Sequence, residues 1–138
     1  MGPRALLFIS AMPSEAATPF LPGRHQIDAY GNGGFRFGGM SHRGSILALP
    51  SGMRAWPVAS IAEIDAAALA PILAEGGAIE ILLLGTGVDP AFIGEQVRAP
   101  LAAAGIRLDA MQTGAAARTY NVLLAEDRRV AAALIAVG

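Results

Sequence analysis

The chain has 138 residues, of which 54% are hydrophobic and 15% charged, and a formal net charge of −1; this is typical of one compact domain and provides no basic surface for nucleic acid. Cysteine and lysine are absent, which excludes disulfides, thiolate or lysine nucleophiles and the lysine of a phosphate-binding P-loop. The histidines, His25 and His42, lack the spacing of a zinc site, so we expect neither a metal nor a cofactor.

The beginning of the chain predicts a flexible or extended arm over residues 1–24, followed by a single globular domain over residues 25–138. Four prolines within the first 24 residues favour the arm. The order of one arginine, an apolar stretch and small residues also resembles a short signal peptide, but Ser10 and Pro13 interrupt the apolar stretch. No apolar run reaches the roughly 18 residues of a membrane-spanning helix. We therefore expect a cytoplasmic protein that is at most peripherally bound to the inner membrane.

The first half of the domain predicts a small antiparallel meander, because short apolar segments alternate with glycine-rich turns. The expected strands cover residues 25–30, 35–37, 45–49 and 53–58. The expected turns cover residues 31–34, 38–44 and 50–52. These turns explain the glycines of the run GNGGFRFGG, since the phosphate loop that it resembles requires a lysine.

After residue 60 the apolar spacing changes from two to about 3.6, which predicts helices. Ser60 and Glu63 have the spacing of a capping box at the start of the first helix, which Gly76 and Gly77 end. A second helix is predicted to start at Asp89 and Pro90 and to end or kink at Pro100. Thr113 is the predicted N-cap of a third helix over residues 114–125.

Between these helices, apolar runs predict strands. The runs at 78–84 and 130–137 are almost continuously apolar, as in strands buried on both faces, and residues 105–111 predict a further strand. A meander followed by alternating strands and helices predicts an α/β, or α+β layered, domain with helices packed on a sheet.

The segment Gly85–Gly87, with the sequence GTG, is the first candidate for a binding site. It follows a predicted buried strand and precedes a helix, where free backbone amides can bind a carboxylate or phosphate. The segment lacks the GxGxxG pattern of dinucleotide-binding proteins, and Asp89 adds negative charge where a phosphate would lie. A tight structural turn is the favoured alternative.

A polar run within the third helix is the second candidate, and it contains Arg118, Thr119, Tyr120 and Asn121. Arg118 and Asn121 are three residues apart and share a helix face. They can face the GTG segment and complete an anion-binding cleft. In the favoured alternative, Tyr120 packs in the core and Arg118 binds a strand end or an acidic neighbour.

Three segments resemble a known family in their order and spacing: IDAYGNGGFRFGGMSHRGSILALPSG, EILLLGTG and TGAAARTYNVLLAEDRRVAAALI. This family of small domains is shared by bacterial and archaeal proteins of unknown function and by mitochondrial complex I assembly factor 3. The resemblance covers residues 25–137. It implies a three-layer fold around a central mixed sheet, whose last strand is buried, antiparallel to the others and inserted between earlier ones. The residues that match the family motifs are Gly85, Thr86, Gly87, Thr113, Arg118, Thr119, Tyr120, Asn121, Glu126 and Arg128.

The resemblance implies a non-enzymatic interaction or assembly scaffold, because the mitochondrial relatives bind another assembly factor and early complex I subunits. It supplies no catalytic residues. The implied partners are respiratory-complex subunits or an assembly factor, and self-association is left open. The alternative is a small-molecule binder or enzyme for an anionic ligand, with the amides of Gly85–Gly87 as donors and Arg118 as a clamp. The predicted pocket comprises Gly85, Thr86, Gly87, Thr113, Arg118, Thr119, Tyr120 and Asn121.

Overall fold

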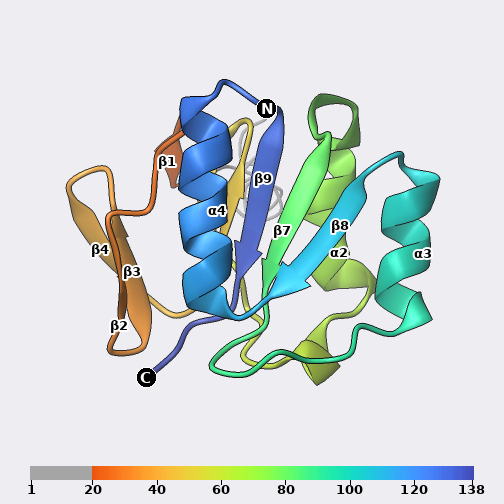
Figure 1. Ribbon diagram of the computed structural model, residues 1–138, viewed down its shortest axis with the longest axis horizontal. Coiled ribbons are helices and arrows are strands. Elements are labelled where there is room, and N and C mark those ends of the chain that lie inside the picture. Colours follow the sequence, from red (N-terminus) through yellow and green to blue (C-terminus); the bar gives the residue numbers. More distant parts are fainter. Residues whose placement is uncertain (1–19) are drawn as a thin grey trace, which may run out of the picture.

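A computed structural model describes residues 20–138 and has three layers (Figure 1). The central layer is a six-stranded mixed sheet with the strand order β1-β6-β5-β9-β7-β8. Helices α2 and α3 cover one face, whereas helix α4 and a three-stranded sheet, β2-β3-β4, cover the other. The predicted α/β class and the implied central mixed sheet are confirmed.

The strands of the first half are β1 (Leu21–Pro22), β2 (Ala29–Gly31), β3 (Gly34–Phe37), β4 (Met40–Arg43), β5 (Ile46–Leu49) and β6 (Gly52–Ala55). The predicted meander is divided between two sheets, because β5 and β6 pair with each other in the central sheet and β2, β3 and β4 form their own. The predicted turn at 38–44 is wrong: only Gly38 and Gly39, both at positive φ, make the turn, and β4 follows. The predicted arm lies outside the described residues up to residue 19, and its end forms β1, which pairs with β6.

The elements of the second half are the 3-10 helix η1 (Ile61–Glu63), α2 (Ala66–Ala74), the 3-10 helix η2 (Gly76–Ala78), β7 (Ile81–Gly85), α3 (Glu95–Ala103), β8 (Arg107–Met111), α4 (Thr113–Ala125) and β9 (Val130–Leu134). The strand predicted at 105–111 and the two buried strands are present, although β9 ends at Leu134.

Three of the predicted helix starts are wrong. Asp65, not Ser60, caps α2, because its carboxylate accepts a hydrogen bond of 2.9 Å from the Ala68 amide. Helix α3 begins after Gly94, not at Asp89 and Pro90, and it continues through Pro100. Gln112, not Thr113, precedes the first turn of α4. Ser60 instead precedes the short 3-10 helix η1, Asp89 lies in the loop before α3, and the Thr113 hydroxyl makes tertiary hydrogen bonds.

The positions of α3 and α4 follow from the order of the strands. Helix α3 connects β7 to β8 on one side of β7, whereas α4 connects β8 back to β9 on the other side of β7. Crossovers between parallel strands are right-handed, so reversing the direction across the sheet puts the second helix on the opposite face. Strand β9 therefore lies between β5 and β7. It runs antiparallel to β5 and parallel to β7. The family resemblance implied a last strand antiparallel to the others, which is correct for β5 and wrong for β7.

Strand β9 separates two hydrophobic cores. Val130, Ala132 and Leu134 belong to the core beneath α4 and the small sheet, while Ala131 and Ala133 belong to the core beneath α2 and α3. All five are buried, which explains why this strand has no alternation of polar and apolar residues.

Leu83, at the centre of β7, tests this assignment because its side chain is fully buried beneath α4. We expect Leu83→Ala to lower the free energy of unfolding by about 2–5 kcal/mol, since it removes apolar contacts and leaves a cavity. Urea denaturation followed by circular dichroism measures the change. The control is Val122→Ala at a 56% exposed position of α4, for which we expect a change within about 0.5 kcal/mol. Equal losses in both variants would contradict the assignment.

Candidate functional site

The GTG segment lies at the carboxyl end of β7, where the chain connections diverge to opposite faces of the sheet. In open α/β sheets this position commonly forms a ligand-binding crevice. Here the start of α4 packs directly against the strand end. A Cβ atom added to Gly85 would lie 2.9 Å from the Thr113 Cα and 3.0 Å from the Leu134 Cδ2. Glycine is therefore required at residue 85 for close packing, independently of any ligand.

The Thr113 side chain joins three segments at this point. Its hydroxyl donates a hydrogen bond of 2.7 Å to the Ile135 carbonyl and accepts one of 3.0 Å from the Gly87 amide. The Thr113 amide in turn donates to the Gly87 carbonyl at 2.9 Å. Because Thr113 is fully buried, its hydroxyl fixes the loop after β7, the start of α4 and the end of β9 relative to one another.

The neighbouring Thr86 also bonds within the protein. Its amide donates to the Met111 carbonyl at 2.8 Å, and its hydroxyl donates to the Asp89 carbonyl at 2.7 Å. The amides of both Thr86 and Gly87, which the anion-binding interpretation uses as donors, thus already have protein acceptors. An anion could reach them only by breaking these bonds, and each buried acceptor left without a donor costs about 1–3 kcal/mol.

Two members of the polar run hold the segment that precedes β2. The Tyr120 side chain is buried in the core, and its hydroxyl donates a hydrogen bond of 3.1 Å to the His25 carbonyl. The Asn121 amide group accepts from the Ile27 amide and donates to the Ile27 carbonyl, both at 2.8 Å. The Asn121 side chain therefore pairs with both backbone hydrogen-bonding groups of Ile27, as a neighbouring strand would.

The other two members of the run have weaker contacts. Arg118 is exposed, and within residues 20–138 its guanidinium has no hydrogen bond or ion pair. The Thr119 hydroxyl has a long contact of 3.8 Å to the Met111 sulfur. The structure thus joins Gly85–Gly87 to Thr113 by hydrogen bonds, whereas Tyr120 and Asn121 bond to a different segment. A ligand or partner site made of all eight residues stays a prediction.

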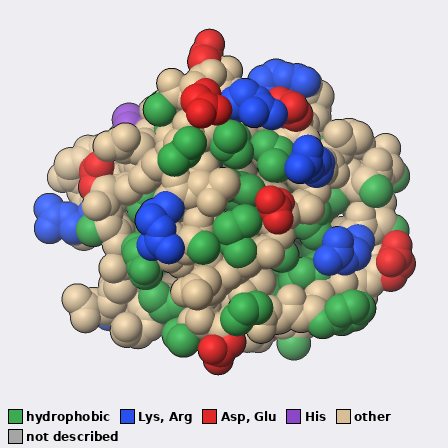
Figure 2. Space-filling view, in the orientation of Figure 1, with side chains coloured by type: hydrophobic (Ala, Val, Ile, Leu, Met, Phe, Trp, Pro, Cys, Tyr) green, Lys and Arg blue, Asp and Glu red, His purple; other side chains and the backbone are tan. Residues whose placement is uncertain are grey.

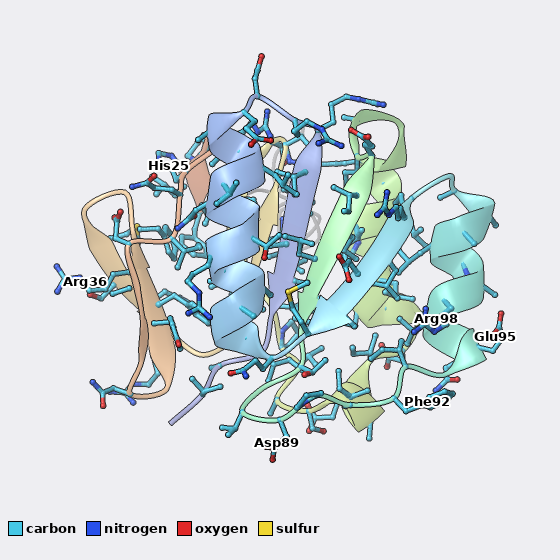
Figure 3. All side chains as sticks on the ribbon, viewed as in Figure 1. His25, Arg36, Asp89, Phe92, Glu95 and Arg98 are labelled. Atoms are coloured by element: carbon cyan, nitrogen blue, oxygen red, sulfur yellow. The ribbon has the colours of Figure 1, made fainter. Side chains whose placement is uncertain are left out.

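A neighbouring loop forms a surface that the sequence reasoning missed. Residues 88–92 are all exposed, with Val88 70% and Phe92 87% exposed. Figure 2 shows hydrophobic side chains at the lower right, over the loop between β7 and α3, and Figure 3 labels Phe92 there. We call residues 88–92 the apolar loop. The sequence did not reveal this loop because Ile93 and Val97 are apolar and spaced as on a helix face. A helix starting at Pro90 would bury both of them, as the observed loop and helix do.

Both ends of the apolar loop are held by side chains. At its start, the Thr86 hydroxyl bonds to the Asp89 carbonyl. At its end, the Ile93 side chain is buried, and the Ile93 carbonyl accepts a hydrogen bond of 2.9 Å from the Arg98 Nε. The loop thus presents Val88 and Phe92 to solvent from a fixed base.

The family-matched residue Arg128 lies at the opposite end of β7. Its guanidinium donates a hydrogen bond of 3.0 Å to the Glu80 carboxylate. This bond, with the charge of Arg128, lowers the pKa of Glu80 below its ordinary value. Charged side chains gather at this end of the molecule (Figure 2). The pair connects the start of β7 to the turn before β9, and we assign it a structural role.

Residues 20–138 contain neither a membrane-spanning helix nor a metal-binding cluster. No helix there has the length and apolar content needed to cross a membrane. No group of histidine and acidic side chains in this part of the chain could hold a metal ion.

Comparison with known proteins identifies relatives over most of the chain. The model of the family "Protein of unknown function (DUF498/DUF598)" matches residues 27–135. An uncharacterised protein of Rhodobacter capsulatus is 39% identical over 117 residues, which cover 85% of this chain and 89% of that protein. The NADH dehydrogenase [ubiquinone] 1 alpha subcomplex assembly factor 3 of Danio rerio is 32% identical over 127 residues, which cover 92% of this chain and 70% of that protein.

A solved structure agrees with the fold. It is the crystal structure of an outer membrane protein from Bartonella henselae, which is 51% identical in sequence and superposes with a TM-score of 0.82. The match covers 86% of this chain and 99% of the Bartonella chain.

The Thr113 hydroxyl can be tested with a matched pair of substitutions. Thr113→Val keeps the shape of the side chain but leaves the Gly87 amide and the Ile135 carbonyl without this partner, so we expect a loss of about 2–5 kcal/mol in the free energy of unfolding. Thr119→Val is the control, since its hydroxyl has only the long sulfur contact, and it should change stability by less than about 0.5 kcal/mol. Urea denaturation measures both. A Thr113→Val protein as stable as the control would show that the hydroxyl does not hold these segments.

The alkaline limit of stability should depend on Tyr120. Burial raises the pKa of Tyr120 from 10.0 to about 12, so the folded state holds the phenolic proton more tightly than the unfolded state does. The stability from this difference is complete below pH 10 and is lost as the pH rises toward about 12. Urea denaturation at a series of alkaline pH values should show a steeper decline for the wild type than for Tyr120→Phe. Parallel declines would indicate that Tyr120 ionises equally in both states.

Proposed function

Because this chain belongs to the family of proteins of unknown function DUF498/DUF598, we propose that it is an interaction protein that assists the assembly of a respiratory enzyme of the complex I type. The Danio rerio relative is named as an assembly factor of NADH dehydrogenase. The sequence similarity supports the transfer of this role, and the apolar loop supplies a surface through which a partner can bind. The proposed activity is binding, without a chemical step.

The apolar loop is the observation that carries the proposal. A phenylalanine side chain exposed to 87% gains roughly 1.5–3 kcal/mol when a partner removes it from water. Aromatic residues are enriched among those that dominate protein interfaces, especially where they enter a pocket of the partner. Because the loop is held at both ends, little conformational entropy is lost on binding.

The surroundings of the loop define the kind of partner. Asp89 lies within the loop, and Glu95 and Arg98 lie on the adjacent first turns of α3 (Figure 3). All three are exposed, so the apolar side chains have a charged rim of both signs. A matching partner has an apolar pocket for Phe92 bordered by polar groups, which fix the orientation more than they add affinity.

The partner is proposed to be a subunit of the respiratory enzyme or another assembly factor. We place the protein on the cytoplasmic side of the membrane that contains the enzyme, where such a partner would recruit it. The sequence also suggests a second function, in which Gly85–Gly87 and Arg118 bind an anionic ligand. It is less favoured, because the Thr86 and Gly87 amides bond to protein acceptors.

Affinity purification of the tagged protein from its host, with gently solubilised membranes, tests this function. We expect mass spectrometry to identify NADH dehydrogenase subunits or an assembly factor with the wild type. Combined Val88→Ser and Phe92→Ser substitutions should reduce this recovery at least tenfold, because they remove the apolar side chains that enter the partner. Both residues are exposed, so the thermal midpoint should change little.

Val122→Ser is the matched control, since Val122 is an exposed valine on α4, outside the loop. It should recover the same partners as the wild type. Recovery of respiratory subunits that is unchanged by the loop substitutions would overturn the loop as the binding surface. If the wild type recovers no respiratory subunit or assembly factor, the assembly role is overturned. If it recovers only a second copy of this chain, the protein self-associates instead.

A further inference from the structure

The outward surface of the small sheet has a composition unlike the rest of the chain. Residues directly opposite each other on antiparallel strands share a face. The buried Phe35 and Phe37 define the inner face of the small sheet, which packs on the core beneath α4. The neighbouring rows therefore face outward, and they consist of Ala29, Arg36 and Ser41 in one row and Gly31, Gly34 and Arg43 in the next. Apart from the two arginines, every outward residue is small.

This face has a hollow of about 500 Å³. It is bordered by the six outward residues, by Asn32 in the turn, and by Tyr30, Phe35 and His42 of the intervening row. Strands β3 and β4 approach each other closely beside it. A Cβ atom added to Gly34 would lie 2.2 Å from the His42 carbonyl oxygen of β4, so only glycine fits. At Gly31, by contrast, an added Cβ atom would meet nothing within 4 Å, so this position is open. The volume of the hollow is in the range of small-molecule sites.

Two like charges lie on this face without an internal counter-ion. Arg36 and Arg43 are diagonal neighbours on adjacent strands, a spacing at which like charges repel each other. Within residues 20–138 neither guanidinium forms a hydrogen bond or an ion pair. The sequence from residue 29 to residue 62 contains no aspartate or glutamate, and the preceding Asp28 carboxylate accepts a hydrogen bond from Gln26 instead. The repulsion would be relieved by an anion from outside the chain.

We propose that this hollow binds a phosphate group, with Arg36 and Arg43 as its charged donors and the Ser41 hydroxyl as a neutral donor. Each guanidinium has a planar pair of N–H groups that can bind two phosphate oxygens, and two such groups match the double charge of a phosphate monoester better than a single carboxylate. Arg36 projects away from α4 and from the body of the molecule (Figure 3), where a ligand can approach it. The phosphate can belong to a soluble phosphate monoester or to a lipid headgroup.

Backbone NMR titration of the ¹⁵N-labelled full chain with inorganic phosphate tests the site, with chloride at equal ionic strength as the reference. We expect saturable shifts at Gly34, Ser41 and Arg43. Arg36→Gln and Arg43→Gln should each weaken binding at least tenfold, because each removes a charged, bidentate donor. Arg107→Gln is the matched control, since it removes an exposed arginine from β8, outside every site proposed above, and it should bind phosphate as the wild type does.

Flotation with vesicles separates the two sources of phosphate. Binding to phosphatidic acid vesicles but not to phosphatidylcholine vesicles, lost in the combined Arg36→Gln and Arg43→Gln variant, would assign a lipid headgroup. A phosphate response that depends on the arginines, without vesicle binding, would assign a soluble phosphate monoester. The proposal is overturned if neither probe gives a response that depends on Arg36 and Arg43. The substitutions lie outside the apolar loop, so this result is independent of the assembly role.

Discussion

The burial of β9 on both faces is the constraint on which the rest of the structure depends. Ala131, Ala132 and Ala133 occupy the centre of the strand, and their small size lets the layers on either side approach closely. Because β9 lies between β5 and β7, it joins the antiparallel half of the sheet to the parallel half. The residue after the strand, Ile135, donates to the Gly85 carbonyl and accepts from the Thr113 hydroxyl. The end of β9 thus fixes the loop that starts at the carboxyl end of β7.

The polar run of α4 follows from the same arrangement. Helix α4 must cross the sheet to connect β8 with β9, and one side of it faces the segment before the small sheet. Tyr120 and Asn121 supply hydrogen bonds to backbone groups there that have no neighbouring strand. The run is therefore the connection between the central sheet and the small sheet. Docking through these bonds leaves the opposite face of the small sheet, with Arg36 and Arg43, in contact with solvent.

The sequence could predict the buried strands but not the roles of individual polar residues. Continuous apolar runs identify β7 and β9 because only a strand covered on both faces needs them. Strand β4 was not predictable as a strand, since Ser41 and His42 between glycines resemble a turn and are paired only through β3. Thr113 matches a helix cap by type, but tertiary contacts use its hydroxyl for the Gly87 amide and the Ile135 carbonyl. The exposure of Phe92 depends on packing and has no local sequence signal.

The two proposed binding surfaces differ in chemistry and in position. The apolar loop follows β7 in the central sheet, whereas the arginine hollow belongs to the separate small sheet, and Phe92 and Arg36 lie on opposite sides of the molecule (Figure 3). A partner that covers Phe92 therefore leaves Arg36 accessible, so a protein and a phosphate group can be bound together. In the proposed assembly role, a lipid phosphate at the second surface would hold the chain at the membrane while the first surface engages the subunit. The geometry thus favours independent binding, in which occupation of one surface changes affinity at the other only through the local concentration of partners.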